Sequence, residues 1–243
     1  MSINSLSCIQ SISTKCNNSA PPPPPINITD LRAPGPFNPF FYLSATNPTY
    51  SRNNVLIACT CVITNQTAPY TFCNGNYYIS TSCLTTEDAG GGDLVFAFCG
   101  DGPGVMLSKY TYNNSGVYTG NVSTTVSGSN ITGEWMQVIL PYKLWVTTYN
   151  IMTGAATGGG GGWNAMFPKN FTLAGSNNGT TWTLIDSRTG YTSSNNGYNY
   201  FTAPIQNQGF TYFRLIGSAT ASSNTFLRMG CAVGLQGQYK FGV

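Results

Sequence analysis

Histidine is absent from this sequence of 243 residues. The chain therefore has no Ser-His-Asp triad, no Cys-His dyad and no His-ligated metal site. Charge is scarce as well, because 7% of the residues are charged, whereas an average soluble protein has roughly a quarter. The net charge of +3, from ten basic and seven acidic residues, is too weak and dispersed for phosphate-driven binding of nucleic acid. No apolar run approaches the roughly 18 residues of a transmembrane helix, so no membrane span is expected.

The shortage of acids also argues against an enzyme. Without histidine, general acid–base catalysis would fall to carboxylates, and Glu134 and Asp186 are the only acidic residues after Asp101. A glycosidase-type pair of carboxylates must converge to within about 5–10 Å, and nothing in the sequence indicates that these two do. We therefore predict a non-enzymatic protein with no catalytic residues.

What the sequence does contain points to β-structure. Hydrophobic residues make up 41% and aromatic residues 13%, and the remainder is rich in Gly, Ser, Thr and Asn, a mixture typical of strands and turns. No stretch shows the 3.6-residue period of an amphipathic helix. Short apolar segments separated by Gly/Asn turns predict an all-β fold, an antiparallel jelly-roll β-sandwich. The expected strands are 55–63, 77–80, 94–98, 135–140, 146–152, 170–175, 181–186, 198–202, 211–216 and 231–235.

One hairpin is particularly clear in the sequence. Asn178-Gly179 is typical of a type I′ turn, whose two central residues need positive φ. The flanking side chains of Phe171, Leu173, Trp182 and Leu184 alternate with polar ones. This alternation predicts that one face of the hairpin is buried.

The chain divides by composition into three regions. Residues 1–52 form an extended arm that contains an oligoproline run, Pro21 to Pro25, which favours a stiff polyproline II spacer over a docking motif for a proline-binding groove. Residues 53–92 form a small Cys-rich β region. Residues 93–243 hold the most regular strand pattern and form the jelly roll.

Cysteine usage bears on the compartment. The sequence contains eight cysteines, and disulfides are typical of oxidising surroundings, yet residues 1–20 lack the basic and apolar regions of a secretory signal. No C-x-x-C pair occurs, so the spacing favours disulfides over free thiols and over a zinc site. A virion protein, made in a cytoplasm and exposed later, would reconcile the two observations. The cysteines are Cys8, Cys16, Cys59, Cys61, Cys73, Cys83, Cys99 and Cys231.

Three motifs in the last region resemble one known family. Gly133-Glu-Trp-Met-Gln-Val-Ile-Leu-Pro141, Pro168-Lys-Asn-Phe-Thr-Leu-Ala-Gly-Ser-Asn-Asn-Gly-Thr-Thr-Trp182 and Phe210-Thr-Tyr-Phe-Arg-Leu215 resemble, in this order, motifs of discoidin domains. These are also called coagulation-factor type C or galactose-binding-like domains. The resemblance covers roughly residues 93–243 and implies a jelly roll with its two ends close together. Many members join those ends with a disulfide, which implies a Cys99–Cys231 bond here.

The resemblance also implies where a ligand would bind. Family members usually bind glycans or lipid head groups with loops at one end of the jelly roll. The corresponding loop here contains Trp163 and Asn164, followed by Lys169, and a second loop carries Tyr191 and Tyr198. Trp163 would stack on a sugar face, and Asn164 and Lys169 would donate hydrogen bonds. The alternative is that these aromatic residues pack on the surface or against another subunit.

No cofactor and no metal ligand set is expected from the sequence. Four acidic residues gather near the start of the jelly roll, where a calcium ion would find oxygen ligands. A solvated acidic loop is the simpler interpretation. These residues are Glu87, Asp88, Asp93 and Asp101.

Together these features predict a structural virion component, a minor capsid or capsid-surface protein of a large DNA virus that carries a galactose-binding-like domain. Its partners would be other capsid or surface subunits and glycans, and its location the virion. The alternative is a carbohydrate-binding module for adhesion or host attachment at an extracellular surface. The fold alone does not decide between them.

Overall fold

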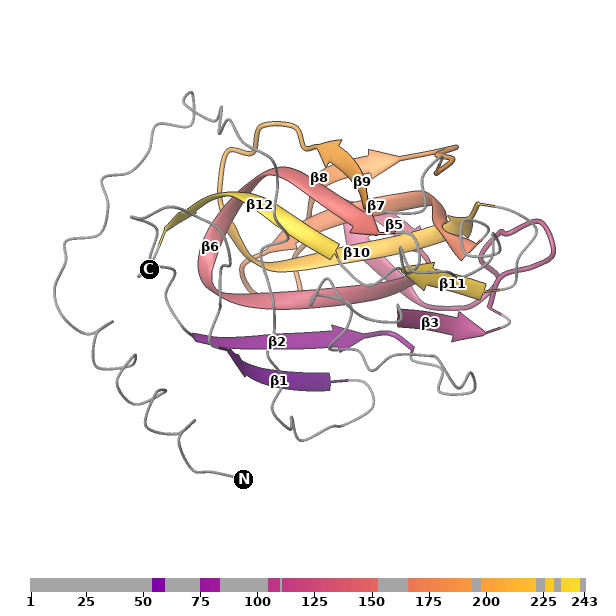
Figure 1. The fold of residues 1–243 in the computed structure, drawn as a ribbon, viewed down its shortest axis with the longest axis horizontal. Coiled ribbons are helices and arrows are strands. Elements are labelled where there is room, and N and C mark those ends of the chain that lie inside the picture. Colours follow the sequence, from indigo (N-terminus) through magenta and orange to yellow (C-terminus); the bar gives the residue numbers. More distant parts are fainter. Residues whose placement is uncertain are drawn as a thin grey trace, which may run out of the picture.

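The computed structural model describes residues 54–59, 75–83, 105–109, 111–152, 166–193, 198–221, 226–229 and 233–240, and these residues contain strands and turns but no α-helix. All pairs between the strands are antiparallel, so the predicted all-β antiparallel fold is confirmed (Figure 1). The strands are β1 (Asn54–Cys59), β2 (Gly75–Thr81), β3 (Val105–Lys109), β4 (Ser123–Val126), β5 (Ser129–Thr132), β6 (Glu134–Met152), β7 (Pro168–Ser176), β8 (Thr183–Arg188), β9 (Tyr198–Thr202), β10 (Phe210–Thr220), β11 (Phe226–Met229) and β12 (Val233–Lys240).

The long strand β6 belongs to both layers of the sandwich. Its first half pairs with β2 and β10, and its second half pairs with β12 and β9. In Figure 1 it curves through a wide bend, so that the two halves run back over each other. The sequence predicted two separate strands here, 135–140 and 146–152, and Pro141 lies between them. Proline fits extended backbone as long as no ladder bond needs its missing N–H, and the strand continues through it.

The first layer has the strand order β1-β2-β6-β10-β7-β8. Strand β2, from the Cys-rich region, pairs with β6 through Tyr78↔Ile139 to Thr81↔Met136, so this region contributes to the main sheet. Two further pairs, β3 with β11 and β4 with β5, lie outside it. The predicted strand at 94–98 and the arm at 1–52 lie outside the described residues.

The main core consists of the inward-facing side chains of both layers. Most of its largest fully buried members come from β6, β7 and β10. Each buried aromatic ring contributes about 1.5–3 kcal/mol of transfer free energy. The fully buried members include Tyr149, Phe167, Phe171, Phe210 and Phe213.

A second, smaller core lies on the opposite face of the first layer. It is formed by Val126, Ala174, Trp182 and Ile216. Neighbouring residues along β7 and β10, such as Leu173 and Leu215, belong to the main core instead, as the two-residue period of a strand requires. The β4–β5 hairpin therefore covers part of the outer face.

The predicted turn of the β7–β8 hairpin was wrong in type. The register closes at Gly175↔Thr183, which leaves a seven-residue connection, and Asn178 does not have positive φ. Its Oδ1 instead accepts hydrogen bonds from the N–H groups of Thr180 and Thr181, an Asx-type cap. The sequence pattern favours Asn-Gly for a two-residue turn, but a local side-chain cap stabilises a longer one.

The two-residue turn occurs elsewhere, between β4 and β5. Ser127 has φ 49° and Gly128 has φ 84°, the pair of positive values that type I′ requires. Ser127 also contacts the last strand of the first layer. Its Oγ accepts the N–H of Leu184, and its own N–H donates to the carbonyl of Trp182.

The predicted alternation across the β7–β8 hairpin was right for β7 and wrong for β8. Phe171 and Leu173 are buried, but Leu184 is 47% exposed. The register shifts between Leu173 and Ala174, which is a β-bulge on the β8 side that changes the face to which the side chains point. Ile185 is buried in place of Leu184.

Candidate functional site

Two segments that carry predicted ligand residues meet the end of β6 at one end of the sandwich. The N–H of Tyr191 donates to the carbonyl of Lys169 at 2.9 Å. Tyr198 pairs with Met152, the last residue of β6. The end of β6, the start of β7 and the chain between β8 and β9 therefore lie together, and we call this region the loop end. Trp163 and Asn164 belong to 153–165, which lies outside the described residues.

The predicted residues differ in how they are placed at the loop end. Lys169 is exposed, whereas Tyr191 is partly buried. The hydroxyl of Tyr191 donates to Asn199 Oδ1 at 2.9 Å, and its ring lies 5.0 Å from the ring of Phe201, centroid to centroid. Burial raises the pKa of Tyr191, and the positive charge of Arg188 opposes this. Tyr198 lies in β9, and its side chain is outside the described residues.

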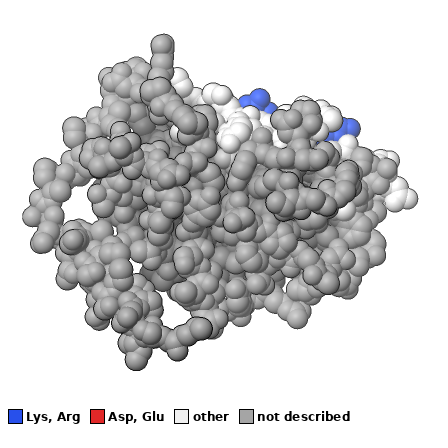
Figure 2. All heavy atoms as spheres, viewed as in Figure 1, with Lys and Arg blue, Asp and Glu red and all other residues white. Residues whose placement is uncertain are grey.

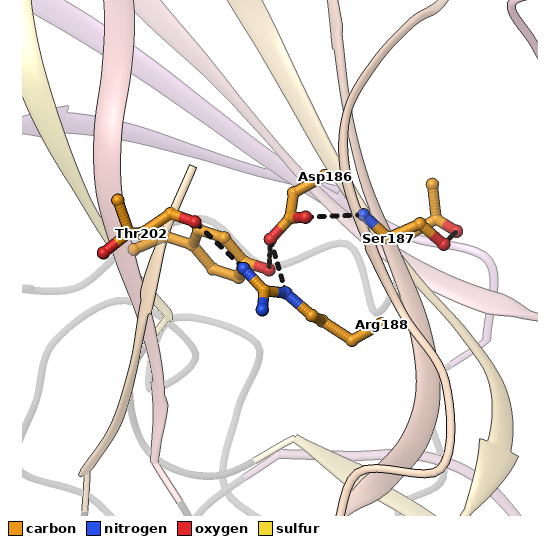
Figure 3. Close-up of polar contacts among 6 residues, drawn as sticks. Asp186, Ser187, Arg188 and Thr202 are labelled. Atoms are coloured by element: carbon orange, nitrogen blue, oxygen red, sulfur yellow. Dashed lines mark hydrogen bonds and ion pairs between the residues drawn. The ribbon is translucent and has the colours of Figure 1, made fainter. Parts of the chain in front are cut away.

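A partly buried polar network joins strands β6, β8 and β9 near the loop end (Figure 3). The carboxylate of Asp186 on β8 accepts the hydroxyl of Tyr149 on β6 at 2.7 Å and Nε of Arg188 at 2.8 Å. A terminal nitrogen of the Arg188 guanidinium donates to the carbonyl of Thr202 on β9 at 2.9 Å. These bonds connect an edge of the first layer to the second layer. No sequence pattern indicated this network, because Tyr149 and Thr202 are distant in the chain from Asp186 and Arg188.

The Asp186 network favours the neutral form of its tyrosine. Burial, followed by the hydrogen bond and the charge of Asp186, raises the pKa of Tyr149. The pKa of Arg188 is raised by the hydrogen bond to Asp186. Tyr149 therefore remains a hydrogen-bond donor and Arg188 remains a cation throughout the physiological pH range. Both of their hydrogen bonds to Asp186 are retained over this range.

Glu134, the acidic residue of the first sequence motif, forms a second buried network. It is 2% exposed, and its carboxylate accepts the hydroxyls of Ser82 at 2.5 Å and Tyr118 at 3.1 Å. Tyr112 donates to the carbonyl of Gly217 at 2.7 Å beside it. The thiol of Cys83 is free, and burial, with a smaller contribution from the Glu134 charge, raises its pKa. Glu134 thus anchors Ser82 to the sheet.

The buried tyrosines predict a loss of stability in alkali. Burial raises the pKa of Tyr118 to about 12 and raises the pKa values of Tyr112 and Tyr149 further, whereas an unfolded tyrosine titrates near 10. The unfolded chain therefore releases these protons first. The stabilisation is complete below about pH 10 and is lost as pH rises towards the folded pKa values.

We expect urea midpoints that stay level to about pH 9.5 and fall above pH 10. Arg214 acts in the opposite direction, because burial lowers its pKa to about 10, but the three tyrosines outweigh it. The variant Tyr118→Phe should have a shallower alkaline slope than the wild-type protein. Equal slopes for the two proteins would show that Tyr118 does not contribute to the loss of stability in alkali.

The three sequence motifs meet around Arg214. Its guanidinium carbon lies 3.9 Å from the ring centroid of Trp135 and 4.2 Å from that of Trp182. The same guanidinium donates to Gln137 Oε1 and to Thr124 Oγ1, each at 2.8 Å. Each motif therefore contributes at least one member of a single cluster, and Thr124 ties the β4–β5 hairpin to it.

Other sequence predictions fall outside the described part of the chain. Cys99, Cys231 and the acidic residues 87, 88, 93 and 101 are not among the described residues. Within the described ranges no group of three His, Cys, Asp or Glu side chains is placed to hold a metal ion, and no helix there is long and apolar enough to cross a membrane. On the face in Figure 2, the described residues are mainly uncharged with small basic patches.

No family model matches the sequence, and no curated protein sequence matches it either. Solved structures do resemble the fold. CBM32-3 from a family 31 glycoside hydrolase of Clostridium perfringens matches at 10% identity and a TM-score of 0.43, over 65% of this chain and 88% of that chain. The module CpGH89CBM32-5 from Clostridium perfringens, in complex with GalNAc-β-1,3-galactose, matches at 10% identity and a TM-score of 0.43, over 65% and 94%.

An F5/8 type C domain from Bacteroides fragilis matches at 13% identity and a TM-score of 0.44, over 69% of this chain and 93% of that chain. These structures are CBM32 and F5/8 type C domains, the discoidin-like group that the sequence motifs resemble. TM-scores of this size transfer no ligand and no binding residue to this chain.

Proposed function

We propose that this domain is a non-catalytic carbohydrate-binding module whose ligand sits at the loop end. The observation that supports the proposal is the meeting of the three segments there, with Lys169 exposed on β7 beside the backbone of Tyr191. Lys169 and Tyr191, which come from two different candidate loops, are joined there by a backbone hydrogen bond. A glycan needs such a surface, because its binding combines an apolar ring face with directed hydrogen bonds.

The loop end suits a glycan because its base is rigid. Tyr191, Phe171 and Phe201 pack edge to face, with ring centroids 5.0 to 6.2 Å apart. The Asp186 network fixes the neighbouring backbone at Thr202. Protein groups that are already held in place before the ligand arrives lose little conformational freedom on binding. Lys169 then supplies a mobile ammonium donor to a sugar hydroxyl.

The proposal is tested with the full chain on a glycan array, followed by calorimetry with the strongest ligand. The variant Lys169→Ala should weaken binding about tenfold, the effect of one charge-assisted hydrogen bond. Trp163→Ala tests the residue predicted from sequence alone and should abolish binding. Lys143→Ala is the control, because Lys143 lies at the opposite end of the same half of β6. Equal affinities for the two lysine variants, or no glycan bound by the wild-type chain, would refute the site.

We also propose a structural role in a virion, which the amino-acid composition of residues 1–52 supports. Residues 1–52 combine the oligoproline run with Phe37, Phe40, Phe41 and Tyr42, a pattern suited to an arm that lies along a neighbouring subunit. Light scattering of the full chain and of a chain lacking residues 1–52 tests it. Higher assemblies formed by the full chain alone would support the role, and monomers in both samples would refute it.

A further inference from the structure

A row of three side chains crosses the first layer on its outer face. Tyr78 on β2, Ile139 on β6 and Tyr212 on β10 are direct neighbours in the strand register. The next residues along these strands, Ile79, Val138 and Phe213, belong to the main core. Because side chains alternate along a strand, the row faces the other way. We call Tyr78, Ile139 and Tyr212 the outer row.

The outer row remains accessible beside the hairpin that covers the rest of this face. Tyr78 is 44% exposed, and Ile139 and Tyr212 are partly exposed. Tyr212 packs against the second core on one side, and a Cβ at Gly179 would come within 3.0 Å of its ring. Tyr212 is therefore fixed in position. On the other side of the row, Tyr78 is followed in the register by Leu56 on the edge strand β1.

The spacing of the row suits a chain of sugar rings. Neighbouring strands lie about 4.8 Å apart, so the two tyrosines, two strands apart, are separated by roughly 9.5 Å. Each ring offers an apolar face together with a polar hydroxyl. Ile139 fills the space between them. An extended ligand that crosses the strands would meet an aromatic ring, an aliphatic side chain and a second aromatic ring in sequence.

The next row on the same face contains a cation without an anionic partner. Ser80, Gln137 and Arg214 are aligned in the register. Arginine has five N–H donors, and those of Arg214 make three hydrogen bonds, all to neutral oxygens. The ion pair found among the described side chains joins Arg188 to Asp186, so no described carboxylate neutralises Arg214. Trp135 and Trp182 hold its guanidinium plane between them.

From this juxtaposition we propose that the outer face binds an acidic oligosaccharide. Its sugar rings lie over Tyr78 and Tyr212, and its carboxylate or sulfate pairs with the guanidinium of Arg214. Guanidinium groups bind planar and tetrahedral oxyanions through paired N–H donors. This site is separate from the loop end and does not depend on the function proposed there.

A second copy of the chain fits this face less well. A two-fold symmetric contact places the same patch of both copies together. Two Arg214 guanidinium groups would then approach each other with no described carboxylate nearby, and like charges at an interface are unfavourable. A ligand that carries negative charge removes this difficulty.

The test measures binding of the full chain to three hexasaccharides by calorimetry. The first contains uronic acids, the second is the same compound with its carboxylates reduced to alcohols, and the third is a sulfated neutral sugar. The charge is varied on the ligand because Arg214 also holds the β4–β5 hairpin. We expect at least one of the acidic compounds to bind about tenfold more tightly than the reduced one, and to lose affinity with added salt.

Tyr78→Ala should weaken binding of the acidic compound by up to about tenfold, the effect of losing one aromatic stack. Tyr200→Ala is the matched control, because Tyr200 is 48% exposed on the other layer. Lys169→Ala should leave this binding unchanged, which separates the site from the loop end. Equal binding of charged and reduced compounds, equal effects of the two tyrosine variants, or a dimer that Tyr78→Ala dissociates would each overturn the proposal.

Discussion

Replacing Asp186 with alanine should lower the free energy of unfolding by about 3 kcal/mol, because it leaves a buried donor without an acceptor. Asp186 is 8% exposed and accepts both the Tyr149 hydroxyl and the Arg188 guanidinium. Tyr149 is 1% exposed, so water does not replace the lost bond. Urea unfolding with an unchanged slope measures the difference.

Tyr149→Phe separates the hydrogen bond from the charge. It removes the donor and leaves Asp186 paired with Arg188, so it should cost about 1 kcal/mol. The double variant should cost less than the sum of the two single variants, because both remove the same bond. Ser187→Ala, at the exposed neighbour of Asp186, is the control. Additive effects would show that Tyr149 and Asp186 are not coupled.

Replacing Trp182 with alanine should cost about 4 kcal/mol, typical of a buried tryptophan. Trp182 is 4% exposed, closes the second core and forms one wall of the Arg214 site. Its carbonyl also accepts the N–H of Ser127. The loss should therefore be greatest around the β4–β5 hairpin.

Hydrogen exchange distinguishes this local loss from general destabilisation. Amides of β4 and β5 should exchange faster in Trp182→Ala than amides of β6, which remains covered by the main core. Leu184→Ala is the matched control, since Leu184 lies two residues away and is 47% exposed. Uniform acceleration across all strands would contradict a distinct role for the second core.

The sequence predicted the fold class well because β-patterning is local. Strands β7, β9 and β10 lie close to their expected ranges, since each has apolar residues bounded by turn residues. The strands β4 and β5 were missed. Their exposed faces are polar, so they have little apolar alternation to detect, and they are held by Trp182 and Arg214 from distant parts of the chain.

The candidate sites, like the strands, could be predicted from the sequence only in part. Lys169 and Tyr191 were expected in two candidate ligand loops, and a backbone hydrogen bond joins them in the fold. The aromatic surroundings of Tyr191 could not be predicted, because Phe167, Phe171 and Phe201 approach it only in the folded sheet. The outer row was missed for a similar reason, since strand register rather than sequence spacing aligns its members.

The turn at Ser127 and Gly128 has a consequence for self-association. Strand β8 is the last strand of the first layer, and an open edge of this kind can take up a strand from another molecule. Proteins often prevent such addition with charged side chains, but only 7% of this chain is charged. Here the Ser127 hydroxyl occupies the N–H of Leu184 and the Ser127 N–H occupies the carbonyl of Trp182. A turn from another hairpin thus occupies the start of this edge, where an added strand would have to pair.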